Sequence, residues 1–408
     1  MTQRPMEGVR ILEVAQFTYT PSAGGVLADW GADVIKVEHA ITGDAQRGMR
    51  GPSGWIDDHY HPIMEHPNRG KRSVGLALED PVALDILYAL AGRSDVFLTN
   101  FLPDARERLR IDVDDIRTVN PRIIYVRGSA FGVRGPEAGK GGYDATAFWA
   151  CAGAGVGVKP QDYDGIVGMP GPAYGDSMGG MTIAGGIAAA LFSRATTGEP
   201  SVVDVSLLSV GVWANAAAID VSIAKGEPFP GGAMGNPTEM LTNPAVGPAR
   251  TSDGRYIMLA MIQVGRYWAD FCRHLGRADL IDDERFDTPE KLLKNAPIAG
   301  KIVHDEIAAR PYAEWIERFQ TLEGQWAGEQ NALEVADDKQ VRANDMILPI
   351  TDADGRPREL VANPVQFDET PPTLTRAPQF AEHTDEVLRE LGYDDDAIIE
   401  LKVGGAVT

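Results

Sequence analysis

Apolar residues recur along the N-terminal third of the chain in two alternating patterns. Short runs rich in Val, Ile and Leu predict strands at residues 9–14, 33–38, 95–100 and 122–127. Helical patterns lie between them, for example at residues 81–91, where Asp80 and the following proline are typical of a helix start. Because strands that alternate with helices form right-handed βαβ units, the pattern predicts an α/β fold with a mostly parallel sheet.

The carboxyl ends of the predicted strands indicate where a ligand binds. In an open parallel sheet the binding crevice lies outside these ends. Residues 15–21, 39–47, 100–103 and 128–132 would therefore surround one crevice. Several cations fall near it, namely His39, Arg47, Lys71, Arg72 and Arg108. As a cluster they predict a phosphate-rich ligand, although each one alone is by default a mobile surface cation.

The pattern changes after residue 175. Two long helices are predicted at residues 177–194 and 204–224, and a stretch rich in Gly and Pro at residues 226–248 resembles a domain boundary. A smaller α+β segment follows, up to about residue 335. We predict three parts: a large domain over residues 1–225, a small α+β domain over 226–335, and a C-terminal segment over 336–408.

Composition limits the class of partner. The 408 residues are 44% hydrophobic and carry a formal net charge of −21, which argues against nucleic acid or an anionic membrane as the main partner. The weakly polar stretch at residues 179–192 is too short to span a bilayer. With two cysteines, Cys151 and Cys272, we expect a cytoplasmic protein without a disulfide framework, and we expect both thiols to be buried.

Two familiar kinds of site are disfavoured. The first strand runs into residues 15–21 without the G-x-G-x-x-G of a dinucleotide site, which argues against a nicotinamide dehydrogenase. His59, His61 and His66 lie in a loop with no helical i, i+4 spacing. We therefore expect no metal site there, and a solvated loop that borders the active site instead.

Two acidic residues open predicted helices. Asp176 follows Gly175 at the start of a long apolar helix, and Asp144 follows Tyr143. An N-cap is the ordinary role of such an Asp, and the residues alone favour it. The same place also suits a nucleophile, because a helix N-terminus stabilises a carboxylate and neighbouring glycines leave room for a bulky thioester. For Tyr143 the ordinary role is that of a core aromatic.

Read together, motifs along almost the whole chain resemble the family III CoA-transferases, which include formyl-CoA transferase and carnitine CoA-transferase. The match rests on the order of many short segments: residues 8–14, 31–38, 43–47, 68–73, 95–101, 142–144, 175–176, 197–198, 203–207, 235–237, 253–256 and 382–388. The resemblance implies a Rossmann-like large domain, completed by residues 336–408, and a smaller domain. It further implies a homodimer of two interlocked ring-like subunits.

The resemblance also implies a site and a mechanism. Asp176 would be the nucleophile, forming a mixed anhydride and then an aspartyl-CoA thioester, with CoA as substrate and no permanently bound cofactor or metal. Each step keeps an activated acyl bond. The implied CoA contacts are Phe17, Thr18, Tyr19, His39, Leu76, Asn100, Phe101, Arg108, Gly141, Gly142, Tyr143 and Asp144.

The chain also departs from formyl-CoA transferase. Phe17 and Tyr19 are bulkier than the side chains of that enzyme, and its Gly-rich flap is matched only loosely by Gly231, Gly232 and Gly235. Oxalate is therefore disfavoured as acceptor. Tyr19, Phe148, Trp149 and Met178 suggest a medium-sized, branched or cyclic acid, and they are equally compatible with core packing.

Two alternatives stay open. α-Methylacyl-CoA racemases resemble the chain but carry a His where Tyr143 stands, and a phenol with a pKa of about 10 is a poor proton shuttle at neutral pH. The resemblance therefore favours the transferase. A catalytically silent CoA-binding protein is the second alternative, and Asp176 argues against it.

Overall fold

The computed structural model describes residues 4–49, 56, 60–160, 163–230 and 242–408. The chain divides into two compact units, which are treated separately. The first contains Met1–Gly155, Gly168–Gly226 and Lys339–Thr408, and the second contains Val156–Val167 and Glu227–Asp338. The domain boundaries given above stay a prediction.

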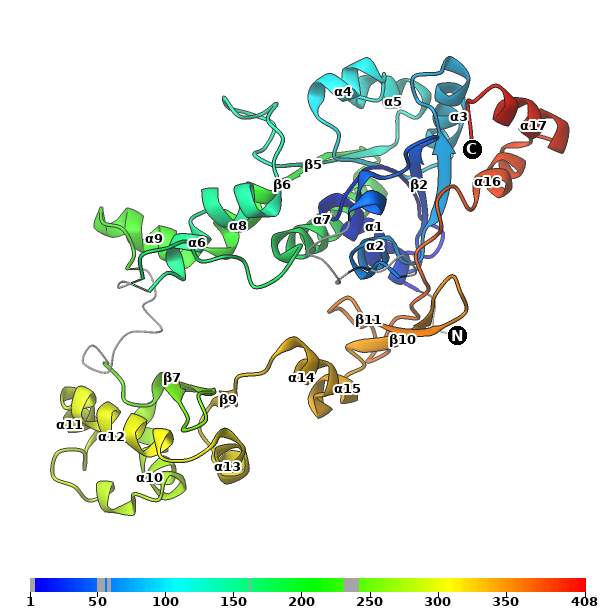
Figure 1. Cartoon of the computed structure of the whole chain (residues 1–408). Helices are drawn as coiled ribbons and strands as arrows, with labels where there is room; N and C mark the ends of the chain where they lie inside the picture. Colours follow the sequence, from blue (N-terminus) through cyan, green and yellow to red (C-terminus); the bar gives the residue numbers. More distant parts are fainter. Residues whose placement is uncertain (1–3, 50–55, 57–59, 161–162, 231–241) are drawn as a thin grey trace. The chain divides into compact units, whose positions relative to one another are not determined.

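A six-stranded sheet forms the centre of the first unit (Figure 1). All of its strand pairs are parallel, and their order is β3-β2-β1-β4-β5-β6. The predicted α/β class with a parallel sheet is thereby confirmed. Strand order reverses between β1 and β4, and such a switch point is where open α/β sheets bind ligands. The strands are β1 (Arg10–Val14), β2 (Asp33–His39), β3 (Arg72–Leu76), β4 (Val96–Thr99), β5 (Ile124–Ser129) and β6 (Val202–Ser206).

Helices cover both faces of this sheet. Successive side chains of a strand point to opposite faces, so Ile11 joins the core beneath α1 and α7, whereas Leu12 joins the core beneath α3, α16 and α17. The strands are therefore apolar on both sides, as buried parallel strands are. The helices of the unit are α1 (Tyr19–Asp29), η1 (Ala45–Gly48), α2 (Pro62–Asn68), α3 (Pro81–Ala91), α4 (Pro103–Arg108), α5 (Val113–Val119), the π-helix η2 (Asp144–Cys151), α7 (Tyr174–Thr197), α8 (Leu207–Ala214), α9 (Ala216–Lys225), α15 (Lys339–Ala343), α16 (Thr384–Leu391) and α17 (Asp395–Val403); α6 (Ala154–Gly157) crosses the unit boundary.

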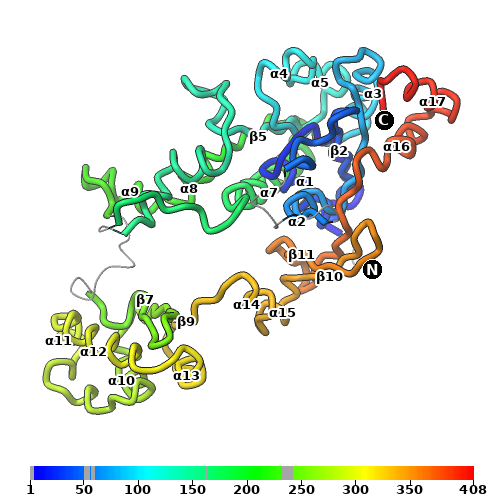
Figure 2. The backbone as a smooth tube through the Cα atoms, in the orientation of Figure 1, coloured from blue at the N-terminus to red at the C-terminus, as the bar shows by residue number. Residues whose placement is uncertain are grey.

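The C-terminal part of the chain lies against the first strands (Figure 2). A hairpin of β10 (Ile347–Thr351) and β11 (Pro357–Val361) precedes it. Thr384 Oγ1 accepts a hydrogen bond from the backbone N–H of Gly75 at 3.1 Å, and Val407 bridges Leu76. These contacts attach residues about 300 positions apart in the sequence to β3.

The second unit has an antiparallel sheet of order β7-β8-β9, with helices packed on it. Its core is rich in aromatic side chains, including Trp268, Phe271, Trp315 and Phe319. Its elements are β7 (Val246–Arg250), β8 (Tyr256–Ala260), α10 (Val264–Leu275), η5 (Ala278–Leu280), α11 (Pro289–Lys294), α12 (Ala296–Ala308), α13 (Tyr312–Arg318), η6 (Phe319–Thr321), β9 (Trp326–Gly328) and α14 (Ala332–Asp337).

The prediction of one long helix at residues 204–224 is wrong. Val203 and Val205 belong to β6 and pair with Val126 and Gly128 of β5. The remaining residues form two helices, α8 and α9, which bend by 71° at Asn215. β-branched residues favour a strand once a neighbouring edge is available, and the sequence pattern alone does not show that edge. No single helix in the described part of the chain is long and apolar enough to cross a membrane, although α8 and α9 together pass that test by length and composition.

Candidate active site

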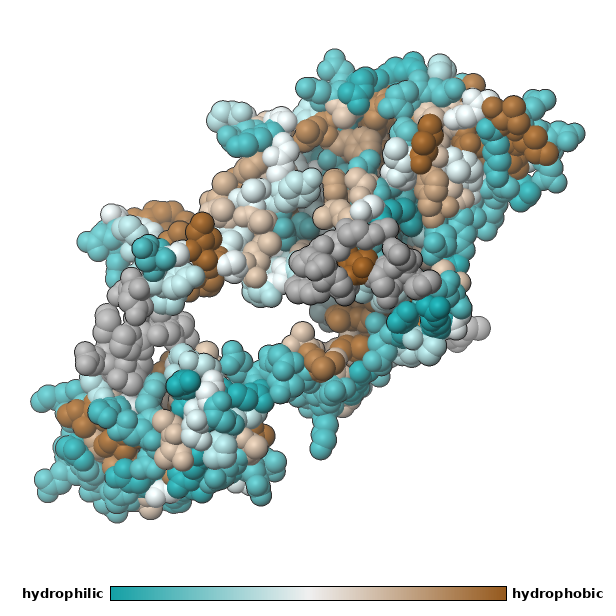
Figure 3. Space-filling view, viewed as in Figure 1, coloured by the Kyte–Doolittle hydropathy of each residue, from teal (hydrophilic) through white to brown (hydrophobic). Residues whose placement is uncertain are grey.

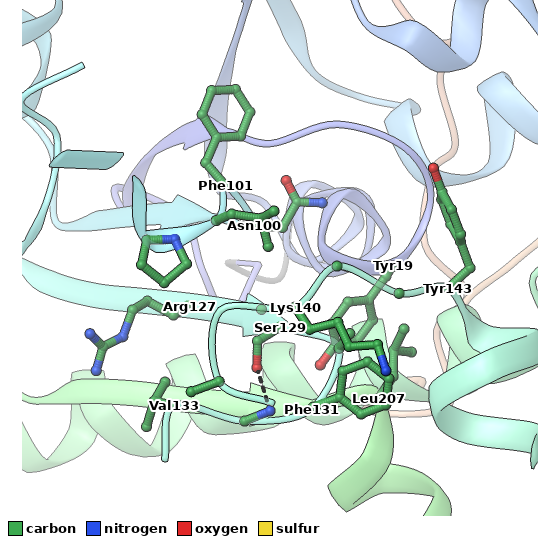
Figure 4. Close-up of a pocket in the computed structure, with 18 of the residues that line it drawn as sticks. Tyr19, Asn100, Phe101, Arg127, Ser129, Phe131, Val133, Lys140, Tyr143 and Leu207 are labelled. Carbon is green, nitrogen blue, oxygen red and sulfur yellow. Dashed lines mark hydrogen bonds between the residues drawn. The ribbon is translucent and has the colours of Figure 1, made fainter. Parts of the chain in front are cut away.

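A cavity of about 910 Å³ opens at the carboxyl ends of β1, β4 and β5 (Figure 4). It therefore lies at the switch point of the sheet. Residues of the predicted segments 15–21, 100–103 and 128–132 line it, whereas none of the described residues 39–47 does. Asp176, in the first turn of α7, lies in the wall of this cavity. The residues that line it are Gln16, Phe17, Tyr19, Asn100, Phe101, Leu102, Pro103, Ala105, Arg106, Arg127, Gly128, Ser129, Ala130, Phe131, Gly132, Val133, Ala138, Lys140, Gly141, Gly142, Tyr143, Thr146, Cys151, Asp176 and Leu207.

Asp176 does not cap its helix. The N-cap of α7 is Ala173, with a positive φ of 59° and no side-chain capping bond, and Asp176 follows three residues later. The capping role is therefore wrong for this residue. Its carboxyl group is half-buried at the cavity wall. Burial, and after it the charge of Asp144, raises the pKa of Asp176 to about 7. The group is thus both accessible and tuned to change its charge near neutral pH.

Asp144 lies behind this carboxylate rather than in the cavity. It starts the π-helix η2, is 7% exposed, and its Oδ1 accepts a hydrogen bond from the N–H of Ala145 at 2.8 Å. Its Oδ2 has no hydrogen-bond partner among the described residues. Burial raises the pKa of Asp144, and backbone N–H groups oppose this shift. Two carboxyl groups therefore share one poorly solvated region.

Tyr143 is not a core aromatic. Its side chain is 59% exposed, lines the cavity and meets the ring of Phe17 edge to face at 5.5 Å between centroids. Phe17 has a positive φ of 65°, and the carboxylate of Asp44 accepts its backbone N–H at 3.1 Å. A non-glycine residue at such a φ is strained and must be held by its surroundings. The loop after β1 is thus fixed with Phe17 and Tyr143 side by side.

Tyr19 is the most enclosed aromatic residue of the cavity wall. It is 6% exposed, and its ring lies between Gly128 of β5 and Gly179 of α7. A Cβ on Gly179 would overlap Cε2 of the ring, and one on Gly128 would lie 3.1 Å from Cε1. Burial, and after it the charge of Asp176, raises the pKa of the Tyr19 phenol, so it stays protonated. The hydroxyl has no hydrogen-bond partner among the described residues.

Asn100 connects the two strands at the switch point. Its Oδ1 accepts the backbone N–H of Gln16 at 3.0 Å, and its Nδ2 donates to the backbone oxygen of Gln16 at 2.7 Å. Both polar atoms of the amide are therefore used to join the loops after β1 and β4. Phe101, the next residue, lines the cavity with its partly exposed ring.

Four of the other predicted contacts do not line the cavity. His39 ends β2, and its Nδ1 accepts the backbone N–H groups of Ile41 and Thr42 at 3.2 Å. Leu76 is fully buried beside it, and Thr18 is buried and donates to Gln46. Arg108 is exposed at the end of α4. The structure thus brings together Phe17, Tyr19, Asn100, Phe101, Gly141, Gly142, Tyr143 and Asp176 at one cavity.

The expected cluster of free surface cations is wrong for three of its members. Lys71 is buried, and its Nζ donates to the carboxylate of Glu13 at 2.7 Å. Arg72 pairs with Asp33 at 2.8 Å, and Arg47 binds both oxygens of Glu38. Glu13 lies on β1, and Asp33 and Glu38 lie on β2, so only the folded sheet reveals these pairings.

Sequence reasoning missed several residues of the cavity. Arg106, Arg127, Ser129, Phe131 and Lys140 line it, and the place of Arg127 and Ser129 at the end of a predicted strand was a usable signal. The expectation that Cys151 is buried is wrong: it is exposed and faces the cavity, while Cys272 is buried. Phe148 and Trp149 are buried in the core instead of lining the cavity, and Met178 packs against that core.

Two further predictions concern loops that the structure covers only in part. His59, Gly231, Gly232 and Gly235 lie outside the described residues. Within the described residues, no three His, Cys, Asp or Glu side chains are placed to hold a metal ion. His66 lies in α2 and not in a loop, so that part of the prediction is wrong; it is half-buried, and desolvation lowers its pKa to about 4.

Comparison with known proteins places the chain in a family. The sequence model of CoA-transferase family III matches residues 6–384. The chain is 30% identical to the (R)-2-hydroxy-4-methylpentanoate CoA-transferase of Clostridioides difficile, over 97% of this chain and 98% of the relative. It is 29% identical to the cinnamoyl-CoA:phenyllactate CoA-transferase of Clostridium sporogenes, over 97% and 95%. The crystal structure of Rv3272 from Mycobacterium tuberculosis superimposes with a TM-score of 0.77 at 28% identity, over 94% of this chain and 99% of that one.

Proposed function

The chain belongs to CoA-transferase family III and is an enzyme of the acyl-CoA:carboxylate CoA-transferase type, and we propose that it moves CoA between carboxylic acids through the side chain of Asp176. One observation carries this proposal. A half-buried carboxylate at a helix N-terminus faces a cavity of about 910 Å³ and has its pKa raised to about 7. It is the only acidic side chain among the described residues that line this cavity.

The proposed reaction consists of four acyl transfers. An oxygen of Asp176 attacks the donor thioester, the C–S bond breaks, and a mixed anhydride and CoA thiolate result. The thiolate then attacks the aspartyl carbonyl, which releases the donor acid and leaves an aspartyl-CoA thioester. The acceptor carboxylate attacks this thioester, the C–S bond breaks, and a second anhydride and CoA thiolate result. The thiolate then attacks the acceptor carbonyl of this anhydride, which gives the new acyl-CoA and releases the Asp176 carboxylate. Covalent catalysis of this kind divides one difficult exchange into easier steps.

Burial of Asp176 suits this chemistry. A carboxylate in water is a weak nucleophile because water solvates its charge, and partial desolvation removes that stabilisation. The dipole of α7 offsets part of the cost by favouring negative charge at its first turn. The group is therefore ionised to a useful extent at neutral pH and still reactive.

The proposed acids are medium-sized, branched or aromatic 2-hydroxy acids. Phe17, Tyr19, Phe131 and Leu207 give the cavity an apolar wall of the size that such acyl groups need. Relatives at 30% and 29% identity have names that specify 2-hydroxy-4-methylpentanoate and phenyllactate. A small dianion such as oxalate would leave most of this apolar surface in contact with water.

CoA is proposed to run from Asp176 across the strand ends. The lining residues Phe17, Asn100, Phe101, Gly141, Gly142 and Tyr143 would hold its thiol arm, and His39, Leu76 and Arg108 would lie toward its nucleotide. Thr18 and Asp144 would act from behind the wall. Lys140 and Arg127 supply positive charge at the cavity, although each also pairs with a carboxylate.

A cytoplasmic homodimer of interlocked subunits is part of the proposal. Trp213 is 81% exposed and Ile223 is 75% exposed on α8 and α9, and hydrophobic side chains gather over these helices in Figure 3. Apolar patches of this kind are typical of surfaces that bind a partner. Both described cysteines are free, as a reducing compartment requires.

The mass of the intact protein after incubation with acyl-CoA donors tests the function. We expect a CoA- or acyl-sized adduct that hydroxylamine releases and that Asp176→Ala abolishes, and exchange of labelled free acid into its thioester. Branched and aromatic 2-hydroxyacyl donors should react faster than oxalyl-CoA. Binding of CoA without any adduct, or washing of solvent deuterium into the α position at enzymic rates, would reject the transferase in favour of the silent or the racemase alternative.

A further inference from the structure

The hydroxyl group of Tyr19 makes no hydrogen bond to any described residue. It is buried, lacks a hydrogen-bond partner in the described residues, and belongs to a side chain that lines the cavity. Burying a hydroxyl without a partner costs free energy, and native proteins rarely accept that cost without a reason. A donor prepared for a bound substrate is such a reason.

The position of the ring is fixed relative to Asp176. Gly179 lies one helical turn after Asp176, so both residues lie on the same face of α7. The ring of Tyr19 packs directly on Gly179, and Gly128 closes its other edge. Tyr19 and Asp176 also line the same cavity. The charge of Asp176 adds to the effect of burial in raising the pKa of the phenol. Tyr19 is therefore held next to the carboxylate without being hydrogen-bonded to it.

The other donors of the cavity differ from Tyr19. Lys140 binds Glu137 at 2.7 Å and is exposed, and Arg127 binds Asp204 at 2.6 Å. The hydroxyl oxygen of Ser129 accepts the backbone N–H of Gly132 at 3.1 Å, as the dashed line in Figure 4 shows. Tyr19 thus combines burial, a fixed ring and an unused proton, which is what preorganised stabilisation of a transition state needs.

We propose that the Tyr19 hydroxyl is a second catalytic group, which donates a hydrogen bond to the thioester carbonyl oxygen while Asp176 attacks the carbonyl carbon. This inference rests on the proposed function. As the new C–O bond forms, the π electrons of the carbonyl move onto its oxygen, and that oxyanion accepts the bond from Tyr19. When the C=O bond re-forms, the C–S bond breaks and thiolate leaves. The phenol keeps its proton throughout, so no acid or base is consumed.

The raised pKa of Tyr19 agrees with this role. A phenol that stays protonated at every working pH is a donor and not a base. During the attack the negative charge of Asp176 moves onto the carbonyl oxygen of the substrate, where Tyr19 would donate its hydrogen bond. The total negative charge around Asp176 and Asp144 therefore does not increase. Tyr19 stabilises that charge in the place to which it moves.

Tyr19→Phe tests the proposal because it removes the hydroxyl and keeps the ring between Gly128 and Gly179. We expect the single-turnover rate of adduct formation on Asp176 to fall by about 100-fold, the typical effect of losing one oxyanion donor. The affinity for CoA should change by less than about threefold, because the ground state gains little from this bond. Tyr125→Phe is the matched control: Tyr125 is a buried tyrosine outside the cavity whose hydroxyl donates to Ile111 at 2.7 Å, and its loss should leave the rate unchanged.

A second substrate separates a hydrogen bond from a structural effect. Sulfur accepts hydrogen bonds poorly, so with a dithioester analogue of the donor the penalty of Tyr19→Phe should shrink to less than about threefold, as in a double-mutant cycle. An equal penalty with both substrates, or a wild-type rate in Tyr19→Phe, would overturn the role of Tyr19 and leave the function of Asp176 intact. If wild-type protein forms no adduct on Asp176, the proposed function itself fails, and this inference with it.

Discussion

The carboxylate of Asp144 acts on that of Asp176 from behind the cavity wall: after burial, it is the charge of Asp144 that raises the pKa of Asp176 to about 7. Asp144 is itself buried, with one oxygen lacking a partner among the described residues. The pair therefore separates two tasks. In the proposed reaction Asp176 contacts the substrate, and Asp144, together with burial, sets the pH at which Asp176 becomes a nucleophile.

The rate of acyl transfer should follow the ionisation of Asp176. We expect kcat/KM to rise with pH through a transition near 7 and to be flat above it, because only the carboxylate attacks. Asp144→Asn removes the like charge, so its transition should lie at lower pH. The pH-rate profiles of both proteins check this. If the transition lay at the same pH in Asp144→Asn as in wild type, the charge of Asp144 would not act on the nucleophile.

Stability should depend on the same group. A carboxyl whose pKa is higher in the folded than in the unfolded state binds protons preferentially in the fold, so it destabilises the protein as pH rises from about 4 to about 7. Asp176→Asn lacks this effect. We expect the variant to match wild type at pH 4 and to exceed it by about 4 kcal/mol at pH 8 in urea unfolding, because the pKa is about 3 units higher in the fold and each unit corresponds to about 1.4 kcal/mol. If the free energies of unfolding of the two proteins changed with pH in the same way across this range, the raised pKa of Asp176 would be contradicted.

Gly179 should be essential for the position of Tyr19. A methyl group in Gly179→Ala would overlap the ring, which Gly128 prevents from moving away. We expect a loss of about 1–3 kcal/mol in the free energy of unfolding, the usual cost of overpacking, together with a marked fall in kcat. Gly185→Ala is the matched control, because it lies on the same helix with open space around the new Cβ. That variant should gain about 0.5–1 kcal/mol from helix propensity and keep its activity.

Lys71 should act in folding rather than in binding phosphate. Its ammonium group is buried among Glu13, Asn68 and the backbone oxygen of Pro21. Lys71→Met would leave the fully buried Glu13 carboxylate with Lys36 as its one remaining cation, at 3.3 Å, so we expect a loss of about 3–5 kcal/mol in chemical unfolding. Lys301→Met breaks an exposed pair with Asp305 and should cost less than about 1 kcal/mol. A Lys71→Met variant that folds normally but binds CoA weakly would instead support a role of Lys71 in binding phosphate.

The sequence by itself determined that the fold is α/β with a mostly parallel sheet and that a crevice lies at the carboxyl ends of its strands. Short apolar runs are a local property, so the sequence predicted strands at residues 9–14, 33–38, 95–100 and 122–127. Their alternation with helices predicted a mostly parallel sheet, whereas the strand order and the strands β3 and β6 came from the structure. The motif around Asp176 pointed to a nucleophile, and the structure places this residue at the cavity. Sequence reasoning, however, favoured an N-cap for Asp176 on the residues alone, because local pattern does not show which residue begins the helix.

Only the tertiary structure decided the partners of the buried polar groups. Lys71 and Glu13 are 58 positions apart, and the sequence has no local signal for their pairing. The contact of Tyr19 with Gly179 likewise needs two helices to pack together, and the pKa of Asp176 depends on water that the folded chain excludes. Periodicity comes from neighbours along the chain, whereas burial, charge pairing and proton affinity come from neighbours in space.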